Sequence, residues 1–486
     1  MSAISVLAVD QGTTGTTTVL VDRAGRIVAR AYREFRQFYP KPGWVEHDAL
    51  EIWRTVADTM REVAAAATEP IVAVGITNQR ETAILWDRET GEPLHHAIVW
   101  QCRRTAPRCD ELAPHGDAVR AKTGLPIDAY FSATKIRWLL DHLDAPDLAR
   151  VAFGTVDTWL VGKLTGGRVH ATDCTNAART LLFDIHEMAW SDTLCELFGV
   201  PPSILPGVKR SIDDFGRVTG VPGLEGVPIT GVAGDQQAAL FGQTCFAPGE
   251  MKNTYGTGCF PMRNTGTKAV ASEHGLLTTV AVGPSGEPCY ALEGPVFIGG
   301  AAIQWLRDEM KLLERAGDSE AAARAVEDNG GVYLVPAFVG LGAPHWDMDA
   351  RGALVGLTRG SSREHVIRAA LESMAYQSHD VIEVMEREAG SRTEALWVDG
   401  GATANNFLLQ FQADISNKRV LRPEIIESTS VGAAYLAGLG VGFWRDADEL
   451  RSLKRTEREF APSMDQETRS RHLSGWRHAL RQARAR

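Results

Sequence analysis

Residues 6–18 read Val6-Leu7-Ala8-Val9-Asp10-Gln11-Gly12-Thr13-Thr14-Gly15-Thr16-Thr17-Thr18, an apolar run that ends in a carboxylate and a turn of small residues. Four consecutive apolar residues predict a buried strand, and the turn leads into a second strand at 19–21. The two glycines allow close approach to the backbone, and the threonine hydroxyls and free N–H groups can donate to an anion. The stretch therefore predicts a β-hairpin whose loop holds phosphate, with Asp10 placed to hold Mg²⁺ through water.

A plain hairpin with an aspartate-started turn would explain this stretch equally well on its own. The pattern of apolar strand, aspartate, glycine and small polar residues returns near the other end of the chain, at Leu396-Trp397-Val398-Asp399-Gly400-Gly401-Ala402-Thr403-Ala404-Asn405-Asn406. Two such loops, far apart in the chain, suggest two similar domains that face one nucleotide across a cleft.

The composition restricts the class of protein. The chain has 486 residues and a formal net charge of −10, and this acidic balance argues against nucleic acid as a partner. At roughly 150 residues per domain the length allows two or three domains, and we divide the chain into residues 1–245 and 246–486. We see no secretory signal and no apolar run of the ~18 residues that cross a bilayer, so we expect no stable membrane insertion. Seven scattered cysteines without a C-x-x-C pair favour reduced thiols and a cytoplasmic location.

Strands and helices alternate along both halves. Residues 71–76 predict a short buried strand that ends in Thr77-Asn78-Gln79-Arg80-Glu81-Thr82, and residues 227–233 predict another, followed by a helix that starts after Gly234-Asp235. The longest helix should cover 363–388. The last forty residues alternate in charge and are interpreted as solvated helices. This alternation is typical of the α/β class.

Polar side chains follow several of the predicted strands: the loops at Asp10 and Asp399, Gly234-Asp235-Gln236, and Asn78-Gln79-Arg80-Glu81. Ligands of open α/β sheets bind beyond the carboxyl ends of the strands, so these features could converge on one crevice. Phosphoryl transfer to an alcohol needs a metal-bound triphosphate, an in-line hydroxyl and a base for its proton. The pattern offers a candidate for each of these needs.

Asp235, at a helix start near the predicted domain boundary, is our candidate general base, and a helix-capping aspartate is the alternative. Arg80 and Glu81 suit a polyol, because a guanidinium donates to hydroxyl oxygens and a carboxylate accepts from hydroxyl protons. On a surface the same dipeptide would be an ordinary ion pair. Aromatic side chains are more often part of a core, but a carbon skeleton also needs an apolar wall. Three aromatic residues could form it: Trp100, Tyr130 and Phe260.

Six stretches form a set that occurs together in one family. They are Asp10-Gln11-Gly12-Thr13-Thr14, Pro40-Lys41-Pro42-Gly43-Trp44-Val45-Glu46-His47-Asp48, Ile76-Thr77-Asn78-Gln79-Arg80-Glu81-Thr82, Ile98-Val99-Trp100-Gln101-Cys102-Arg103, Gly234-Asp235-Gln236-Gln237-Ala238-Ala239-Leu240-Phe241-Gly242-Gln243 and Asn253-Thr254-Tyr255-Gly256-Thr257-Gly258-Cys259-Phe260. Together they resemble the FGGY carbohydrate kinase family, and residues 130–138 and 352–372 are similar to its two general signatures. The likeness covers essentially the whole chain, and the segments at 78–82 and Trp100 separate the members that phosphorylate glycerol from the pentulose kinases.

The resemblance implies two actin-like, ribonuclease H-like domains that flank a nucleotide cleft. It implies ATP-dependent phosphorylation of glycerol to sn-glycerol 3-phosphate, with MgATP as donor and Asp235 as general base. Domain closure would exclude water, which competes with glycerol for the phosphoryl group. The partners would be glycerol and ATP, and the chain would form a homo-oligomer, a dimer or a tetramer.

Matched motif by motif, the family's site residues fall at defined positions of this chain. Glycerol would contact Arg80, Glu81, Trp100, Tyr130, Asp235, Gln236 and Phe260. The nucleotide would contact Thr13, Thr14, Gly15, Thr257, Gly300, Gln304, Gly401 and Asn405, and Asp10 would face the metal.

The chain departs from the family in two places. Gly15-Thr16-Thr17 stands where relatives commonly carry two serines and an arginine, so a guanidinium that faces phosphate is missing at 17, which leaves nucleotide affinity and donor preference open. The loop at 220–226 carries no Lys or Arg, whereas some relatives bind a sugar bisphosphate with a basic glycine-rich loop, so we expect no such feedback. Two alternatives stay open: a kinase for another small polyol or ketose, and a non-catalytic actin-like nucleotide switch, which would need neither a polyol pocket nor a base.

Overall fold

The first hairpin forms where the sequence predicts it. In the computed structural model, which describes residues 4–144 and 147–485, β1 (Ser5–Gln11) and β2 (Gly15–Val21) run antiparallel, with Asp10 opposite Thr17. The apolar residues of β1 are buried because α1 (Ala49–Ala66) covers one face of the sheet and α13 (Ser428–Gly440) covers the other.

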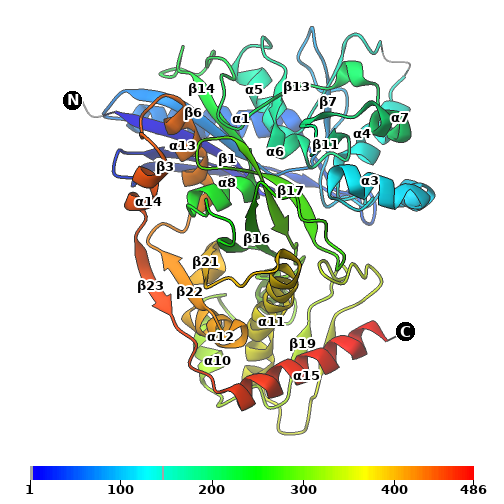
Figure 1. Cartoon of the computed structure of the whole chain (residues 1–486), viewed down its shortest axis with the longest axis vertical. Helices are drawn as coiled ribbons and strands as arrows, with labels where there is room; N and C mark the ends of the chain where they lie inside the picture. The colour runs from blue at the N-terminus through cyan, green and yellow to red at the C-terminus, as the bar shows by residue number, and fades with distance from the viewer. Residues whose placement is uncertain (1–3, 145–146, 486) are drawn as a thin grey trace.

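The first sheet has the strand order β14-β6-β1-β2-β3. β6 (Ile71–Asn78) and β14 (Ile229–Gly234) run parallel to β1, and β3 (Ile27–Glu34) runs antiparallel to β2. The carboxyl ends of β1, β6 and β14 therefore lie at the same edge of the sheet, in the upper part of Figure 1.

The second sheet has the order β17-β18-β16-β15-β21-β22-β23. Its strands are β15 (Met251–Tyr255), β16 (Cys259–Gly266), β17 (Leu277–Val282), β18 (Pro288–Glu293), β21 (Ala395–Asp399), β22 (Arg419–Pro423) and β23 (Thr456–Phe460). The central order β18-β16-β15-β21-β22 repeats β3-β2-β1-β6-β14 in both neighbours and directions. The two halves are thus a structural duplication, which confirms the prediction of two similar domains.

The strands of the two halves correspond to one another in a different way from the one that the sequence pattern predicts. The sequence pattern matched the loop after Asp10 with the loop after Asp399, but the counterpart of the β1–β2 hairpin is the β15–β16 hairpin. β21, which ends at Asp399, corresponds to β6. An apolar run followed by polar residues marks any buried strand that ends at the ligand edge, so it cannot distinguish a hairpin strand from a crossover strand.

One helix of the second half belongs to the core of the first. α13 packs on β1, β6 and β14 and lies beside them in Figure 1. The contact is close because glycines face the helix: a Cβ on Gly75 would lie 2.1 Å from the carbonyl oxygen of Ala433. The division at 245/246 falls between α8 (Asp235–Gly242) and β15 and stays a prediction. α13 follows this boundary in the sequence but packs on the sheet of the first half.

The long helix α11 (Arg363–Ala389) forms as predicted and ends at Gly390, which has a left-handed φ of +67°. The expectation of helices alone in the last forty residues is wrong, because β23 lies between α14 (Ala447–Leu453) and α15 (Gln466–Arg484). Four of the five residues of β23 are exposed, so this edge strand shows no apolar alternation in the sequence.

The other helices of the described chain are α2 (Ala106–Leu112), α3 (Gly116–Thr123), α4 (Ser132–Asp141), α5 (Val156–Leu164), α6 (Cys174–Ala177), α7 (Asp192–Phe198), α9 (Ala301–Asp308), α10 (Asp318–Arg324) and α12 (Asn406–Ser416). The short strands are β4 (Gln37–Phe38), β5 (Glu46–His47), β7 (Ile84–Asp87), β8 (Ala97–Ile98), β9 (Val151–Gly154), β10 (Ala171–Asp173), β11 (Phe183–Asp184), β12 (Ala189–Trp190), β13 (Gly207–Lys209), β19 (Tyr333–Val335) and β20 (Ala353–Val355). Within residues 4–144 and 147–485, no helix combines the length and the apolar character that a membrane crossing requires.

Candidate active site

The charged residues predicted for the substrate meet at the end of two neighbouring strands. Arg80 and Glu81 follow β6, and Asp235 follows β14, which runs parallel beside it. The Nε of Arg80 lies 3.1 Å from Oδ1 of Asp235. The side chains of Arg80 and Glu81 are 2% exposed, whereas that of Asp235 is 27% exposed. The Asp235 carboxylate is therefore the most exposed acid of this group.

Glu81 is held in an unusual backbone conformation. Its φ is +61°, and Thr82 N donates across it to Arg80 O at 2.7 Å, which makes a very tight turn. Such conformations cost about 1–3 kcal/mol and persist at sites where the surrounding structure holds them. Here Ser132 Oγ donates to the carbonyl oxygen of Glu81 at 3.0 Å, and Arg179 Nε donates to Oε1 of Glu81 at 2.7 Å.

Two further charged residues, Arg179 and Glu293, complete the group and were not predicted. Both side chains are fully buried. The two carboxylate oxygens of Glu293 accept from the two Nη atoms of Arg80, each at 2.7 Å, and Arg179 Nη1 lies 3.3 Å from Glu293. Burial alone would raise the pKa of Glu293, but Arg179 and Arg80 lower it to about 2. The one sequence feature that could have indicated Glu293 is its position directly after the apolar run Tyr290-Ala291-Leu292.

Lys252, also missed, links the second half to the start of α8. Its Nζ donates to Oε1 of Gln236 at 2.5 Å and to the carbonyl oxygen of Phe260 at 3.1 Å. Burial lowers the pKa of Lys252 to about 8, against the opposing effect of nearby carboxylates that include Asp399 and Asp235. The β15–β16 hairpin is thereby attached beside Asp235.

The predicted aromatic residues lie in two places. The rings of Trp100 and Tyr130 meet edge to face with centroids 5.6 Å apart, and Trp100 Nε1 donates to Thr13 Oγ1 at 2.9 Å. The Arg179 guanidinium carbon lies 5.8 Å from the centre of the Tyr130 ring. These contacts connect the first hairpin to the charged group. Phe260 lies in β16 of the other half, where its carbonyl oxygen accepts from Lys252 Nζ.

Asp10 lies at the carboxyl end of β1, where Ser430 Oγ donates to its Oδ2 at 3.4 Å. Burial and the negative charge of Asp235 raise the pKa of Asp10 to about 7. In the described residues, no three His, Cys, Asp or Glu side chains are grouped so that they could hold a metal by themselves. Two carboxylates that repel one another fit Mg²⁺, which proteins usually bind with one or two carboxylates, waters and the phosphates of a substrate.

A cavity of about 390 Å³ opens in the second half, within the usual size of small-molecule sites. Five of the residues predicted for the nucleotide line it: Thr257, Gly300, Gln304, Gly401 and Asn405. A Cβ on Gly401 would meet no atom within 4 Å, so this glycine leaves open space for a ligand. Ser319, which accepts from Asn405 Nδ2 at 3.3 Å, lines the cavity as well and was not predicted.

The other nucleotide candidates lie elsewhere. Thr13 and Thr14 belong to the turn of the first hairpin, Gly15 is the first residue of β2, and none of the three lines this cavity. The β15–β16 hairpin connects the cavity to the start of α8, because Thr257 lines the cavity and Lys252 Nζ donates to Gln236 Oε1. The structure thus contains a buried charged group at the ends of β6 and β14, and a separate cavity of about 390 Å³ in the second half.

Residues 5–242 match the N-terminal domain of the FGGY family of carbohydrate kinases, and residues 251–441 match its C-terminal domain. The chain belongs to the FGGY family of carbohydrate kinases. It is 56% identical over 491 residues to a glycerol kinase of Enterobacter sp. (strain 638), an alignment that covers 99% of this chain and 98% of that protein. The predicted family is therefore confirmed.

Solved FGGY structures confirm the two-domain actin-like fold. A glycerol kinase of Plasmodium falciparum with ADP superposes with a TM-score of 0.92 at 37% identity and covers 100% of this chain and 99% of that one. A ligand-bound xylulose kinase of Lactobacillus acidophilus has a TM-score of 0.87 at 20% identity, over 98% of this chain and 97% of that one, which shows a shared fold alone.

Proposed function

We propose that this FGGY kinase transfers the γ-phosphoryl group of MgATP to glycerol and releases sn-glycerol 3-phosphate and ADP. The observation that carries the proposal is the partly exposed carboxylate of Asp235, held 3.1 Å from the buried Arg80 guanidinium beside Glu81. This arrangement supports roles for Asp235 as the base and for Arg80 and Glu81 as polyol-binding groups, and the whole-chain similarity to glycerol kinases supports glycerol as the polyol.

In the proposed reaction Asp235 accepts the proton of the attacking hydroxyl. The glycerol oxygen forms a bond to the γ-phosphorus as the bond to the β-phosphate oxygen breaks, and ADP leaves with that electron pair. Arg80 and Glu81 orient the hydroxyls that do not react, because one donates and the other accepts. The remaining proposed glycerol contacts are the polar Gln236 and Tyr130 and the apolar faces of Trp100 and Phe260.

The charges favour a neutral substrate. Two guanidinium groups, of Arg80 and Arg179, face the three carboxylates of Glu81, Glu293 and Asp235. Both Nη atoms of Arg80 already donate to Glu293, and Nη1 also donates to Gln237 Oε1 at 3.2 Å. A sugar acid would therefore meet no uncompensated arginine here. A small polyol needs only one or two donors and an acceptor.

We assign the nucleotide to the two remaining places. Thr13, Thr14 and Gly15 would contact the phosphates, whereas the cavity around Gly401 would hold the adenosine. Residues 1–245 would then carry the glycerol site and the phosphate hairpin, and residues 246–486 the adenosine side. Asp10 would hold Mg²⁺ through water, and the ion would neutralise charge on the phosphates during transfer.

We also propose that the chain forms a dimer or tetramer and acts in the cytoplasm. Leu354 and Leu357 are exposed, and in the described chain the sheet that contains β20 has only β19 as its second strand, which leaves apolar surface and an open edge for a second copy. A cytoplasmic location fits the use of ATP and the seven free, buried cysteines of the described residues. Light scattering after size exclusion would measure the assembly.

A coupled assay of ADP release with a panel of substrates tests the proposed function. We expect glycerol to give a kcat/KM at least about a hundredfold above those of erythritol, D-xylulose and D-gluconate, because both Nη atoms of Arg80 already donate to Glu293 and few donors are left for a larger polyol or a sugar acid. A higher value for another polyol or ketose would assign the chain to a different substrate. Slow ATP hydrolysis that no polyol changes would favour the nucleotide switch.

A further inference from the structure

Glu293 holds the guanidinium of Arg80 on its Nη side, opposite the Nε edge that meets Asp235. The Glu293 side chain is fully buried, and its two oxygens pair with both Nη atoms of Arg80 at 2.7 Å. A bidentate pair of this kind fixes the plane and the rotation of the guanidinium as well as its position. The Nε edge of Arg80 is thereby directed at Asp235, which it meets with a single contact at 3.1 Å.

This orientation matters for the base. Arg80 has five N–H donors, and Asp235 lies close enough to attract more than one of them. Without Glu293, the guanidinium could rotate and form its bidentate pair with Asp235 instead. Such a pair would occupy the carboxylate oxygens that must accept the proton of the substrate, and would withdraw donors from the hydroxyls that Arg80 orients.

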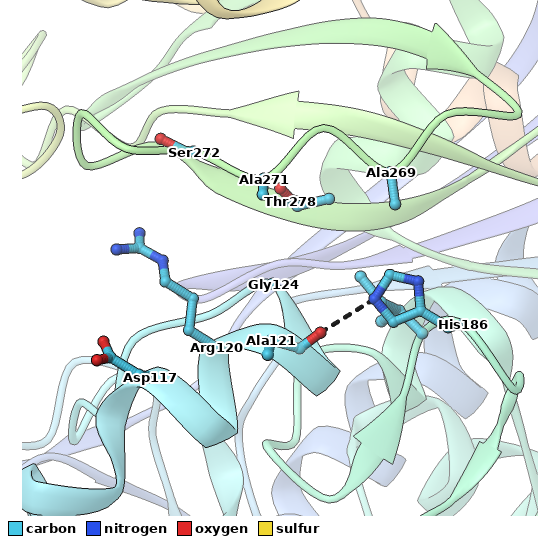
Figure 2. Close-up of a pocket in the computed structure, with 10 residues that line it drawn as sticks. Asp117, Arg120, Ala121, Gly124, His186, Ala269, Ala271, Ser272 and Thr278 are labelled. Carbon is cyan, nitrogen blue, oxygen red and sulfur yellow. Dashed lines mark hydrogen bonds between the residues drawn. The ribbon is translucent and has the colours of Figure 1, made fainter.

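Glu293 comes from the second half of the chain, but its hairpin is bonded to the first half. In the β17–β18 hairpin, Thr278 N donates to Gly124 O at 3.0 Å and Tyr290 Oη donates to Ile185 O at 2.7 Å. Figure 2 shows this contact region, where Arg120 and His186 of the first half and Thr278 of β17 line a cavity of about 230 Å³. The hairpin therefore keeps Glu293 at a fixed place relative to Arg80.

We propose that Glu293 is a positioning residue of the glycerol site, which acts through Arg80 by holding its guanidinium away from a bidentate pair with Asp235. The proposal rests on the proposed function, since it concerns how the same pocket binds glycerol and leaves the base free. Glu293 itself has no free oxygen for the substrate in this arrangement.

The test compares steady-state kinetics of Glu293→Gln, Arg80→Lys and the double variant in the full-length enzyme. Glutamine keeps the shape of Glu293 but cannot form the charged bidentate pair. We expect Glu293→Gln to raise the KM for glycerol about tenfold or more and to lower kcat about tenfold, while the KM for MgATP stays within about twofold. Because Glu293 acts through Arg80, the double variant should match Arg80→Lys within about threefold instead of multiplying the two effects.

Two further variants separate positioning from stability. Glu386→Gln breaks a partly buried ion pair, with Lys418 Nζ at 2.5 Å, outside the proposed glycerol site, and should leave the KM for glycerol unchanged. Glu293→Asp keeps the charge but shortens the side chain, and should give a KM between those of the wild type and Glu293→Gln, which keeps the test decisive if the glutamine variant does not fold.

An unchanged KM for glycerol in Glu293→Gln, or in Glu293→Asp where the glutamine variant fails to fold, would overturn the inference. Independent, multiplying effects of Glu293→Gln and Arg80→Lys would also overturn it. In both cases an active wild type would leave the proposed function intact. A wild type that does not phosphorylate glycerol would overturn the proposed function, and this inference with it.

Discussion

Replacing Asp235 by asparagine removes the proposed base and changes little else. Asparagine has nearly the same shape, and its amide oxygen can still accept from Arg80 Nε, which lies 3.1 Å from the aspartate oxygen. What is lost is the capacity to take a proton, and general-base assistance contributes about 10²–10⁴ in rate, or roughly 3–5 kcal/mol. We therefore expect kcat to fall at least about a hundredfold.

Glycerol binding should change less than the rate. The amide keeps one acceptor, so the loss is one charged hydrogen bond replaced by a neutral one, about 1 kcal/mol, and the KM for glycerol should rise by about fivefold or less. A coupled assay of ADP release gives both constants, and a single-turnover experiment shows whether the chemical step is the one that slows.

A matched aspartate outside the pocket supplies the control. Asp380 is partly buried, and its Oδ2 accepts from Trp476 Nε1 at 2.7 Å in the second half of the chain. Asp380→Asn makes the same chemical change and should leave kcat near the wild-type value. A kcat of Asp235→Asn within about threefold of the wild type would refute the assignment of the base.

Four further outcomes are expected. Arg80→Ala should weaken glycerol binding by about 1–3 kcal/mol and also lower the melting temperature, because it leaves the buried Glu293 and Glu81 with Arg179 as their remaining arginine partner. Calorimetric titration with an unchanged Kd would remove Arg80 from the site. The folded-state pKa of Asp10, about 7, lies above its ordinary value of 3.8, so its contribution to stability is present below pH 4 and is lost as the pH rises to 7. Asp10→Asn should therefore raise the melting temperature of the metal-free protein more at pH 8 than at pH 5, and Mg²⁺ at pH 8 should stabilise the wild type but not the variant. Thr17→Arg should lower the KM for MgATP several-fold by restoring a guanidinium in β2 of the first hairpin, opposite Asp10. An unchanged or higher KM would show that position 17 does not face phosphate here. Fructose 1,6-bisphosphate should neither bind tightly nor lower activity, since the loop at 220–226 has no cation, and inhibition at micromolar concentration would contradict this.

The parts of the site that the sequence predicts are those that follow strands. The apolar run before Asp10 could only be a buried strand, and the strand before Arg80 and the one before Asp235 are parallel neighbours, so their ends had to converge. The residue roles themselves stay predictions. The family is confirmed by the two matching family domains, and the two-domain fold is confirmed by the solved glycerol kinase structure.

The parts that could not be predicted depend on contacts between distant segments. Arg179 and Glu293 are charged residues whose burial becomes tolerable only when Arg80 and Glu81 arrive to pair with them. The position of α13 on the first sheet depends on glycines at 75 and 231, which make room for the helix but carry no pattern that says so. β23 was missed because an exposed edge strand resembles a polar helix in composition.

A crystal structure of the complex with glycerol and a non-hydrolysable ATP analogue would test the central claim most directly. The account predicts that one terminal hydroxyl of glycerol lies within hydrogen-bonding distance of the Asp235 carboxylate and in line with the γ-phosphate, with a second hydroxyl on Arg80 and Glu81. Glycerol bound in another place, or an Asp235 carboxylate that touches neither the hydroxyl nor its path to the phosphate, would contradict it.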